Sequence, residues 1–225
     1  MSTGPDAEQA VPHDTPAVSS APWAVPGSYT VKMTAAGKIM SAPQTVVMDP
    51  RVKIPDADLQ KQFAVSKTMY DEMMQATTAI HEATILRKQM EADGYKGPSG
   101  ASSELESKLE KIIGVERGEE RGGGRRGGGG QQAPTIGSVR MQLARLEHEI
   151  QNADVAPTTT QMEAADEMGK PLSGLLEQWN EVKKTDLKSL NQMLQEKNLP
   201  LLSLNTNVID HDVEDQIEFG DEDEP

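Results

Sequence analysis

Cysteine is absent from this sequence of 225 residues, which excludes disulfide bonds and thiolate metal sites. Aromatic residues make up only 3% of the chain, although such side chains supply much of the buried area in most enzyme cores. No apolar run approaches the roughly 20 residues that a membrane-spanning helix needs. Residues 1–20 also lack the basic and apolar regions of a signal peptide. We therefore expect neither a membrane span nor an export signal in this chain.

Positive charge is scarce as well, because 22 Lys and Arg face 36 Asp and Glu, for a net charge of −14. Nine of the acids lie in residues 210–225, which leaves a net charge of about −5 for the rest of the chain. Nucleic-acid binding requires a basic face that contacts phosphates. The one local cluster of arginines, Arg121, Arg125 and Arg126, follows a run of glutamates. Nucleic acid is therefore not an expected partner.

An extended segment with alternating side chains lies near the N-terminus. Tyr29, Val31 and Met33 alternate with polar residues, which predicts a strand with one apolar face. Gly37 suits a turn with positive φ, and a second extended run covers 44–48. Two strands alone are marginal in water. The pattern therefore predicts the end of a β-sandwich whose earlier strands are missing, and we expect the chain to be a fragment.

The composition divides the chain into four regions. Residues 1–25 form an arm rich in Pro, Ala and Ser, which we expect to be disordered. Residues 26–55 form a partial immunoglobulin-like β unit and connector, and residues 56–200 a helical bundle interrupted by a glycine-rich loop at 117–134. Residues 201–225 form an acidic tail.

Helical periodicity dominates the third region and predicts a mainly α fold. The first helix is expected at about 57–92, with Asp56 as N-cap after Pro55. Its main apolar stripe has 4-3-4-3 spacing and is thickened every seven residues by Met69, Ala76, Ala83 and Met90. Further helices are expected at about 103–113, 135–153 and 158–198, opened by capping-box patterns at Ser103–Glu106 and Thr158–Gln161.

Pro171 lies inside the last helical pattern and should kink or interrupt it. Short loops make neighbouring helices antiparallel. The expected architecture is an antiparallel bundle of three long rods, the middle one split by the glycine loop, with a small β-hairpin at one end.

No catalytic, cofactor-binding or metal-binding constellation emerges from the residues. The four histidines, His13, His81, His148 and His211, have no metal-ligand spacing. His81 and His148 are expected on helices and are interpreted as surface or boundary residues. The acids around His211 lack the glycine and terminal glutamate of a calcium loop, which favours a solvated tail: Asp210, Asp212, Glu214 and Asp215. The glycine-rich loop has no preceding strand and no GK[ST] sequence, so it does not match a phosphate-binding loop.

Two tryptophans and several methionines remain to be placed. Trp179 lies on the apolar stripe of the last helix and is interpreted as core. Trp23 lies in the N-terminal arm and is expected to pack on the hairpin or on a missing domain. Methionines on the helices suggest either intramolecular core, which we favour, or a pliable groove for a partner: Met69, Met73, Met74, Met90 and Met141.

The stretch PGSYTVKMTAAGK…QTVVMDPRVKIPDADLQKQF resembles the C-terminal region of bacterial BNR-repeat, sortilin-like glycosyl hydrolase proteins. In that family a sialidase-like β-propeller is followed by an immunoglobulin-like module ending in such a hairpin, and then by a helical hairpin. The resemblance includes residues 13–16, the glycine-rich interruption at 121–130 and the stretch 175–191. The propeller and the earlier immunoglobulin-like strands are absent here, so no active-site residue can be transferred. Members of the family are typically exported.

These considerations lead to three hypotheses. The first is a non-catalytic C-terminal module that packs against an immunoglobulin-like sheet or a propeller domain. The second is a free-standing helical interaction protein that self-associates or binds another subunit by coiled-coil packing or strand addition. The third, a hydrolase, rests on the family name alone. We expect no catalytic, cofactor-binding or metal-binding residues in this chain.

Overall fold

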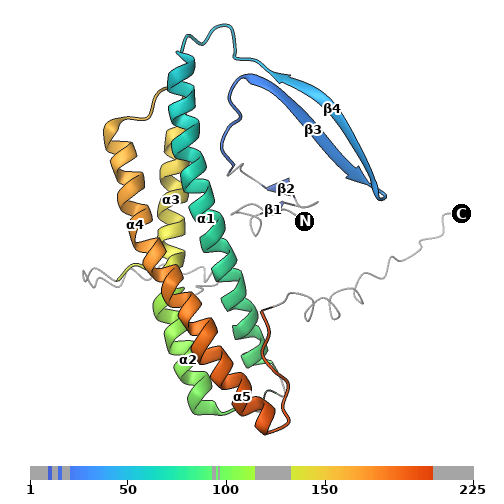
Figure 1. Cartoon of the computed structure of the whole chain (residues 1–225). Helices are drawn as coiled ribbons and strands as arrows, with labels where there is room; N and C mark the ends of the chain where they lie inside the picture. The colour runs from blue at the N-terminus through green and yellow to red at the C-terminus, as the bar shows by residue number, and fades with distance from the viewer. Residues whose placement is uncertain are drawn as a thin grey trace, which may run out of the picture. The chain divides into compact units, whose positions relative to one another are not determined.

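The computed structural model describes residues 10–11, 15–16, 21–92, 95, 97–114 and 133–204, and its elements are mainly helical (Figure 1). The expected mainly α fold with a small antiparallel hairpin is confirmed. The elements in order are β1 (Ala10–Val11), β2 (Thr15–Pro16), β3 (Gly27–Ala35), β4 (Lys38–Val46), α1 (Asp56–Glu91), α2 (Ser99–Ile112), α3 (Ile136–Gln151), α4 (Thr159–Val182), the π-helix η2 (Lys183–Leu187) and α5 (Lys188–Glu196).

The chain divides into two compact units. The first contains Met1–Thr77 and Gly137–Gly174, and the second contains Thr78–Ile136 and Leu175–Pro225. In the first unit α3 runs antiparallel to the adjoining parts of α1 and α4 (Figure 1). In the second unit α2 runs antiparallel to the C-terminal part of α1 and to the α4–α5 segment. The short connections α1–α2 and α3–α4 therefore join antiparallel helices, as expected.

Much of the N-terminal arm, the glycine-rich segment and the acidic tail lie outside the described residues, so the expectations for them stay predictions. Within the arm, the two-residue strands β1 and β2 pair antiparallel, with Ala10 opposite Pro16 and Val11 opposite Thr15. In the part of the chain that the structure describes, no helix is long and apolar enough to cross a membrane.

The hairpin β3–β4 is closed by a two-residue turn. Ala36 and Gly37 have φ values of 48° and 73°, the left-handed pair that a type I′ turn requires and that matches the twist of the strands. The register runs without a break from Ala35 opposite Lys38 to Gly27 opposite Val46. The second strand therefore begins at Lys38, six residues before the run expected from the sequence, because the tight turn brings it into register at once.

Helix α1 begins at Asp56, close to the expected start, but its cap differs. The carbonyl of Pro55 accepts a hydrogen bond from the Asp58 backbone N–H at 2.9 Å, so Asp56 lies in the first turn and is not the N-cap. Its carboxylate still lies near the positive end of the helix dipole. Met69, Ala76 and Ala83, which were expected to thicken the apolar stripe, are fully buried. The centre of the buried face is formed by these three residues together with Ser66, Met73, Ala79 and Leu86.

The two predicted capping boxes have different outcomes. At the start of α4, the Gln161 backbone N–H donates to Thr158 Oγ1 at 3.2 Å and Gln161 Oε1 accepts from the Thr158 backbone N–H at 2.9 Å. This reciprocal pattern confirms the second box. The first is wrong, because α2 begins four residues earlier at Ser99, after Pro98. Pro98 precedes the first turn, where a missing N–H removes no helical hydrogen bond, and Ser103 lies inside the helix.

Pro171 does not interrupt α4, which continues unbroken to Val182. The α-helical pattern changes instead at η2, a π-helical turn, before α5 continues the same helical segment. A π-turn accommodates one extra residue without ending the helix.

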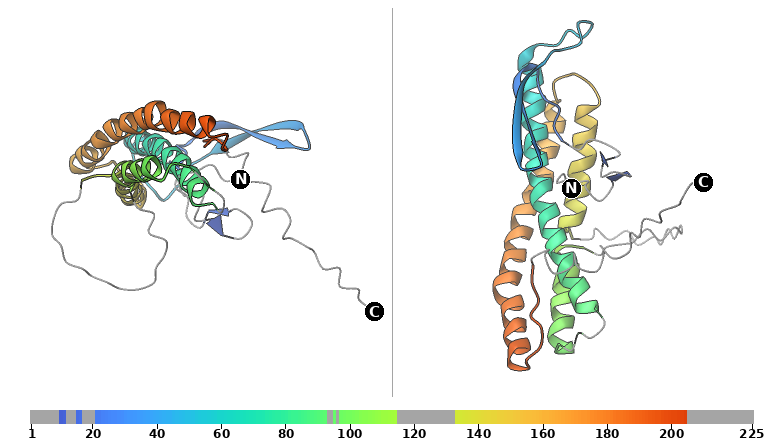
Figure 2. Two further views of the ribbon diagram at one scale, coloured as in Figure 1. Left: turned by 90° about the horizontal axis from the view of Figure 1, so that it is seen from below. Right: turned by 90° about the vertical axis from the view of Figure 1, so that its right-hand side faces the viewer.

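After α5 the chain reverses and runs back alongside that helix (Figure 2). Asn198 adopts a φ of 52°, and the Leu199 backbone N–H donates to the Leu194 carbonyl at 2.9 Å, which closes the helix end. Asn191 Nδ2 donates to the Leu202 carbonyl at 2.9 Å and Asn191 Oδ1 accepts from the Leu202 N–H at 2.8 Å. Gln89 pairs in the same way with Ser203, at 2.7 and 2.9 Å. Two amide side chains thus satisfy the backbone of an extended segment whose Leu202 is buried.

Replacing Asn191 by alanine should destabilise the protein by about 1–3 kcal/mol, because the Leu202 N–H and C=O would lose their partners. Urea unfolding monitored by circular dichroism measures the change. The matched control is Asn180→Ala, at an exposed position of α4. An equal effect of the two substitutions would contradict a clamping role for Asn191.

Candidate functional site

The hairpin β3–β4 presents one apolar face. Residues paired across antiparallel strands share a face, so Tyr29, Val31 and Met33 lie on the same side as their partners Gln44, Ala42 and Met40. This face is not covered by other parts of the described chain. Val31 is 53% exposed, Met33 54% and Met40 49%.

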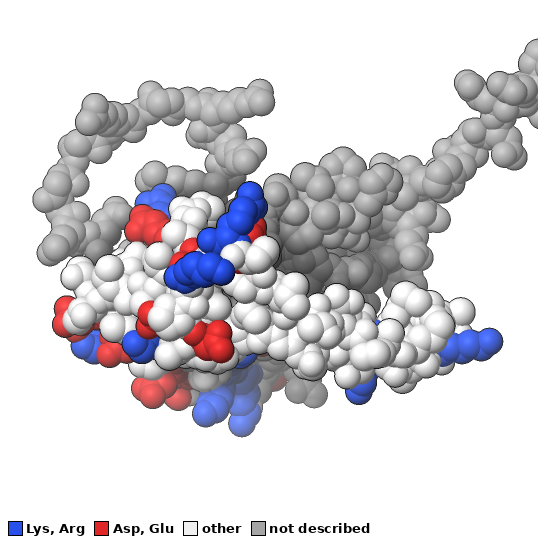
Figure 3. Space-filling view, turned by 90° about the horizontal axis from the view of Figure 1, so that it is seen from above, with Lys and Arg blue, Asp and Glu red and all other residues white. Residues whose placement is uncertain are grey.

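The opposite face of the hairpin is more polar and carries Lys32, whereas Lys38 pairs with Ala35 and lies on the apolar face, next to the turn. Thr30, Lys32 and Thr34 lie there, opposite Pro43, Ser41 and Ile39 respectively. Residues 27–46 contain two lysines, Lys32 and Lys38, and no acidic residue. In Figure 3 the hairpin surface is mostly uncharged, with blue atoms at its end. The hairpin is therefore a weakly basic, apolar element in a strongly acidic chain.

The base of the hairpin is fixed within the first unit by hydrogen bonds of nearby residues. The Tyr29 hydroxyl donates to the Val25 carbonyl at 2.6 Å, and the Trp23 backbone N–H donates to Gln151 Oε1 of α3 at 2.7 Å. Gln151 Nε2 donates in turn to Glu147 Oε1. These bonds tie the entry to β3 to a helix of the same unit.

A cavity of about 240 Å³ lies beside this base and is lined by residues of the hairpin end, α1 and α3, among them Trp23, Val47, Phe63 and Ser66. Trp23 is 59% exposed and lies next to the hairpin end, one of the two positions expected for it. Ser66 is almost completely buried, and its Oγ has no hydrogen-bond partner among the described residues.

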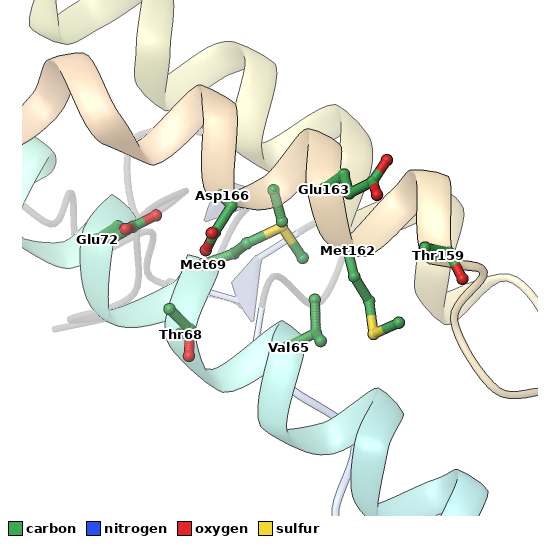
Figure 4. Close-up of a pocket in the computed structure, with 9 residues that line it drawn as sticks. Val65, Thr68, Met69, Glu72, Thr159, Met162, Glu163 and Asp166 are labelled. Atoms are coloured by element: carbon green, nitrogen blue, oxygen red, sulfur yellow. The ribbon is translucent and has the colours of Figure 1, made fainter.

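A second cavity, of about 360 Å³, lies between α1 and α4 within the first unit (Figure 4). The side chains of Met69 and Met162 extend into the space between the helices, with Glu72 and Asp166 at one side. Gly169 allows a close approach, because a Cβ there would collide with the Glu72 carboxylate. Burial raises the pKa of Glu72 above its usual value, and the charge of Asp166 raises it further.

In the second unit, Trp179 is buried with only 1% of its surface exposed, which confirms the core assignment. Its indole Nε1 donates to Glu82 Oε2 at 2.8 Å, and Lys183 Nζ lies 2.8 Å from the same oxygen. Lys183 also lies 5.5 Å from the centre of the Trp179 ring. The cluster therefore provides an acceptor for the N–H of the buried indole, and through Lys183 and Glu82 it links the start of η2 to α1.

The histidines on helices, His81 and His148, are both exposed, as expected. His13, His211 and the tail acids lie outside the described residues. Within the described ranges, no group of three or more His, Asp or Glu side chains is arranged to hold a metal ion. Met69 and Met73 are core, whereas Met141 is 53% exposed.

Sequence reasoning missed Glu72, Glu82 and Gln151, which are polar residues on otherwise amphipathic helices. A weak signal was available for Glu82, because a buried tryptophan needs an acceptor for its N–H. Sequence spacing does not show which carboxylate of another helix provides that acceptor. Comparison with protein-family models, curated proteins and solved structures gave no match to this chain.

The raised pKa of Glu72 predicts a pH-dependent stability. The folded state keeps a proton that the unfolded chain loses above the usual value of 4.5, so the contribution of Glu72 to stability falls as the pH rises through this range. Glu72→Gln should therefore stabilise the protein at about pH 7, by about 0.5 kcal/mol or less because water screens the carboxylate.

The gain should disappear below about pH 4, where Glu72 is protonated in both states. Urea midpoints across this pH range test the prediction. Glu163→Gln is the control, since Glu163 lines the same cavity from an exposed position of α4. A gain that is independent of pH, or equal in the control, would contradict the assignment.

Proposed function

We propose that this chain is a non-catalytic structural and interaction module, the C-terminal part of a glycosyl hydrolase-like propeller protein. In this role the helices hold the β3–β4 hairpin, and a partner sheet covers it. The observation that carries the proposal is the exposed apolar face of the hairpin, formed by Tyr29, Val31, Met33 and Met40.

Physical chemistry supports a partner for this face. A two-stranded hairpin is marginal in water unless a third strand or a packed face stabilises it, and exposed contiguous apolar surface is typical of interaction sites. The turn at Ala36–Gly37 and the unbroken register make this a regular sheet element rather than an irregular loop. Its base is tied to α3 through Trp23 and Gln151. A regular, anchored and uncovered sheet element is suited to joining another sheet.

The resemblance of residues 26–63 to the C-terminal region of sialidase-like propeller proteins supports the same conclusion from the sequence side. In those proteins the hairpin ends an immunoglobulin-like module that follows the propeller. The partner sheet would then belong to that module, and the helical units would support it without chemistry of their own.

A second candidate function is a free-standing interaction protein whose hairpin adds to a sheet of another subunit or of a second copy. The observation in its favour is that neither β3 nor β4 pairs with a further strand among the described residues. The two candidates share the hairpin surface and differ in whether the partner sheet belongs to the same polypeptide.

The face assignment predicts the outcome of site-specific photo-crosslinking in cells that naturally produce the protein. A benzophenone side chain at Val31, on the apolar face, should crosslink to a β-strand segment of the partner several-fold more efficiently than one at Lys32, on the polar face. Mass spectrometry of the crosslinked peptides identifies the segment and shows whether it belongs to the same polypeptide. Equal yields from the two neighbouring positions, or no product from Val31, would contradict the proposal.

The absence of catalysis is tested separately. The purified chain should not hydrolyse sialosides or aryl glycosides above the rate in buffer. Turnover that follows the protein through purification and is lost on substitution of one of its carboxylates would show that the chain is an enzyme.

A further inference from the structure

The two edges of the hairpin differ in the backbone groups they present. In a hairpin closed by a two-residue turn, the pair next to the turn exchanges both backbone hydrogen bonds, and every second pair does so along the ladder. Here the bonded pairs begin with Ala35–Lys38 and continue through Met33–Met40, Val31–Ala42 and Tyr29–Gln44. The intervening residues direct their N–H and C=O groups to the free edges.

On the β4 edge, the outward-directed residues are Ile39, Ser41, Pro43 and Thr45. Pro43 has no N–H and therefore interrupts the row of donors in the middle of this edge. Proline in an outward position is the arrangement that protects an edge from strand addition.

On the β3 edge, the outward-directed residues are Ser28, Thr30, Lys32 and Thr34. Each has a backbone N–H, so the row of donors and acceptors on this edge is complete. No other described strand pairs with it.

We propose that the partner adds a β-strand to the β3 edge and not to the β4 edge. This inference rests on the proposed function of the hairpin as an interaction element. The added strand would exchange backbone hydrogen bonds with Thr30, Lys32 and Thr34. One edge of the hairpin is thus open, and the other is closed by Pro43.

The side chains of β3 define the chemistry of that strand. Paired residues on neighbouring strands share a face, so the residue paired with Lys32 lies on the polar face, beside a positive charge. The residues before and after it lie on the apolar face, beside Val31 and Met33. The hairpin has lysines and no acids, which favours an acidic residue opposite Lys32. The partner strand should therefore alternate apolar, acidic, apolar.

The test moves the edge-blocking proline from one strand to the other. Thr30 and Pro43 are directly opposite each other, so Thr30→Pro places a proline on the β3 edge at the ladder position where Pro43 lies on the β4 edge. Position 30 directs its N–H outward, so this substitution removes no hydrogen bond of the hairpin itself. The matched control, Pro43→Thr, opens the β4 edge and leaves β3 unchanged.

Both variants are made in the full chain that carries the benzophenone at Val31. Thr30→Pro should lower the affinity for the partner about tenfold, measured from the crosslinking yield as a function of concentration, because a backbone hydrogen bond is lost and the proline ring obstructs the edge. Pro43→Thr should retain the yield. Amide hydrogen exchange at Met33 and Ala42, which lie in bonded pairs of the ladder, shows whether the hairpin remains paired in each variant.

A charge exchange tests the predicted sequence of the partner strand. Lys32→Glu should weaken crosslinking, and replacement of the acidic residue in the captured segment by lysine should restore it. A captured segment without the apolar–acidic–apolar alternation would overturn the inferred chemistry.

The outcomes separate this inference from the function on which it rests. No crosslink from Val31 in the unaltered hairpin would overturn both. A crosslink that survives Thr30→Pro with the hairpin still paired would overturn the assignment of the β3 edge alone. If Thr30→Pro unpairs the hairpin, Lys32→Glu decides, since it changes an exposed side chain and leaves the backbone intact; an unchanged yield in that variant would overturn the proposal.

Discussion

The buried face of α1 is the constraint on which both compact units depend, because each of them contains part of this helix. Met69, Met73, Ala76, Ala83 and Leu86 form the centre of that face. A chain with few aromatic residues has to fill its core with methionine, alanine and branched aliphatic side chains, which requires close and continuous helix packing. The short side chains permit a close approach, as does Gly169 of α4 over Glu72 within the first unit.

The extents of the helices could be predicted from the sequence because periodicity extends over many residues, whereas local signals were less informative. Thr158–Gln161 and Ser103–Glu106 carry similar capping patterns, and only the first begins a helix. The second lies within a helix that begins after Pro98, so the pattern alone does not distinguish an end from an interior. Pro171 was expected to kink or interrupt α4, yet the helix continues past it and changes to π geometry twelve residues later, at Lys183. One missing backbone bond did not outweigh the packing of the surrounding apolar residues.

The candidate surface could be predicted in part, since the alternation of Tyr29, Val31 and Met33 already indicated one apolar face. The difference between the β3 and β4 edges could not be predicted from the sequence, because the second strand was expected only at 44–48 and this range does not contain Pro43. That difference depends on the turn, since a shift by one residue would direct the N–H position of Pro43 inward and open the β4 edge. The positive φ angles of Ala36 and Gly37 fix the turn, and the turn fixes the register.

The extended segment after α5 and the strand β3 differ in how their backbone hydrogen-bonding groups are satisfied. After α5, Asn191 and Gln89 provide side-chain partners for the extended residues Leu202 and Ser203, so this segment needs no neighbouring strand. The β3 strand has no comparable side chains along its outer edge, and its apolar face is exposed on the same strand. A single added strand would pair with that edge and extend the sheet that presents the apolar face. Edge pairing satisfies the backbone groups of β3 but leaves its apolar face uncovered, and a helix laid on the face would leave the edge unpaired. A partner sheet that adds a strand at the edge and also packs a layer on the face would satisfy both the backbone and the apolar surface.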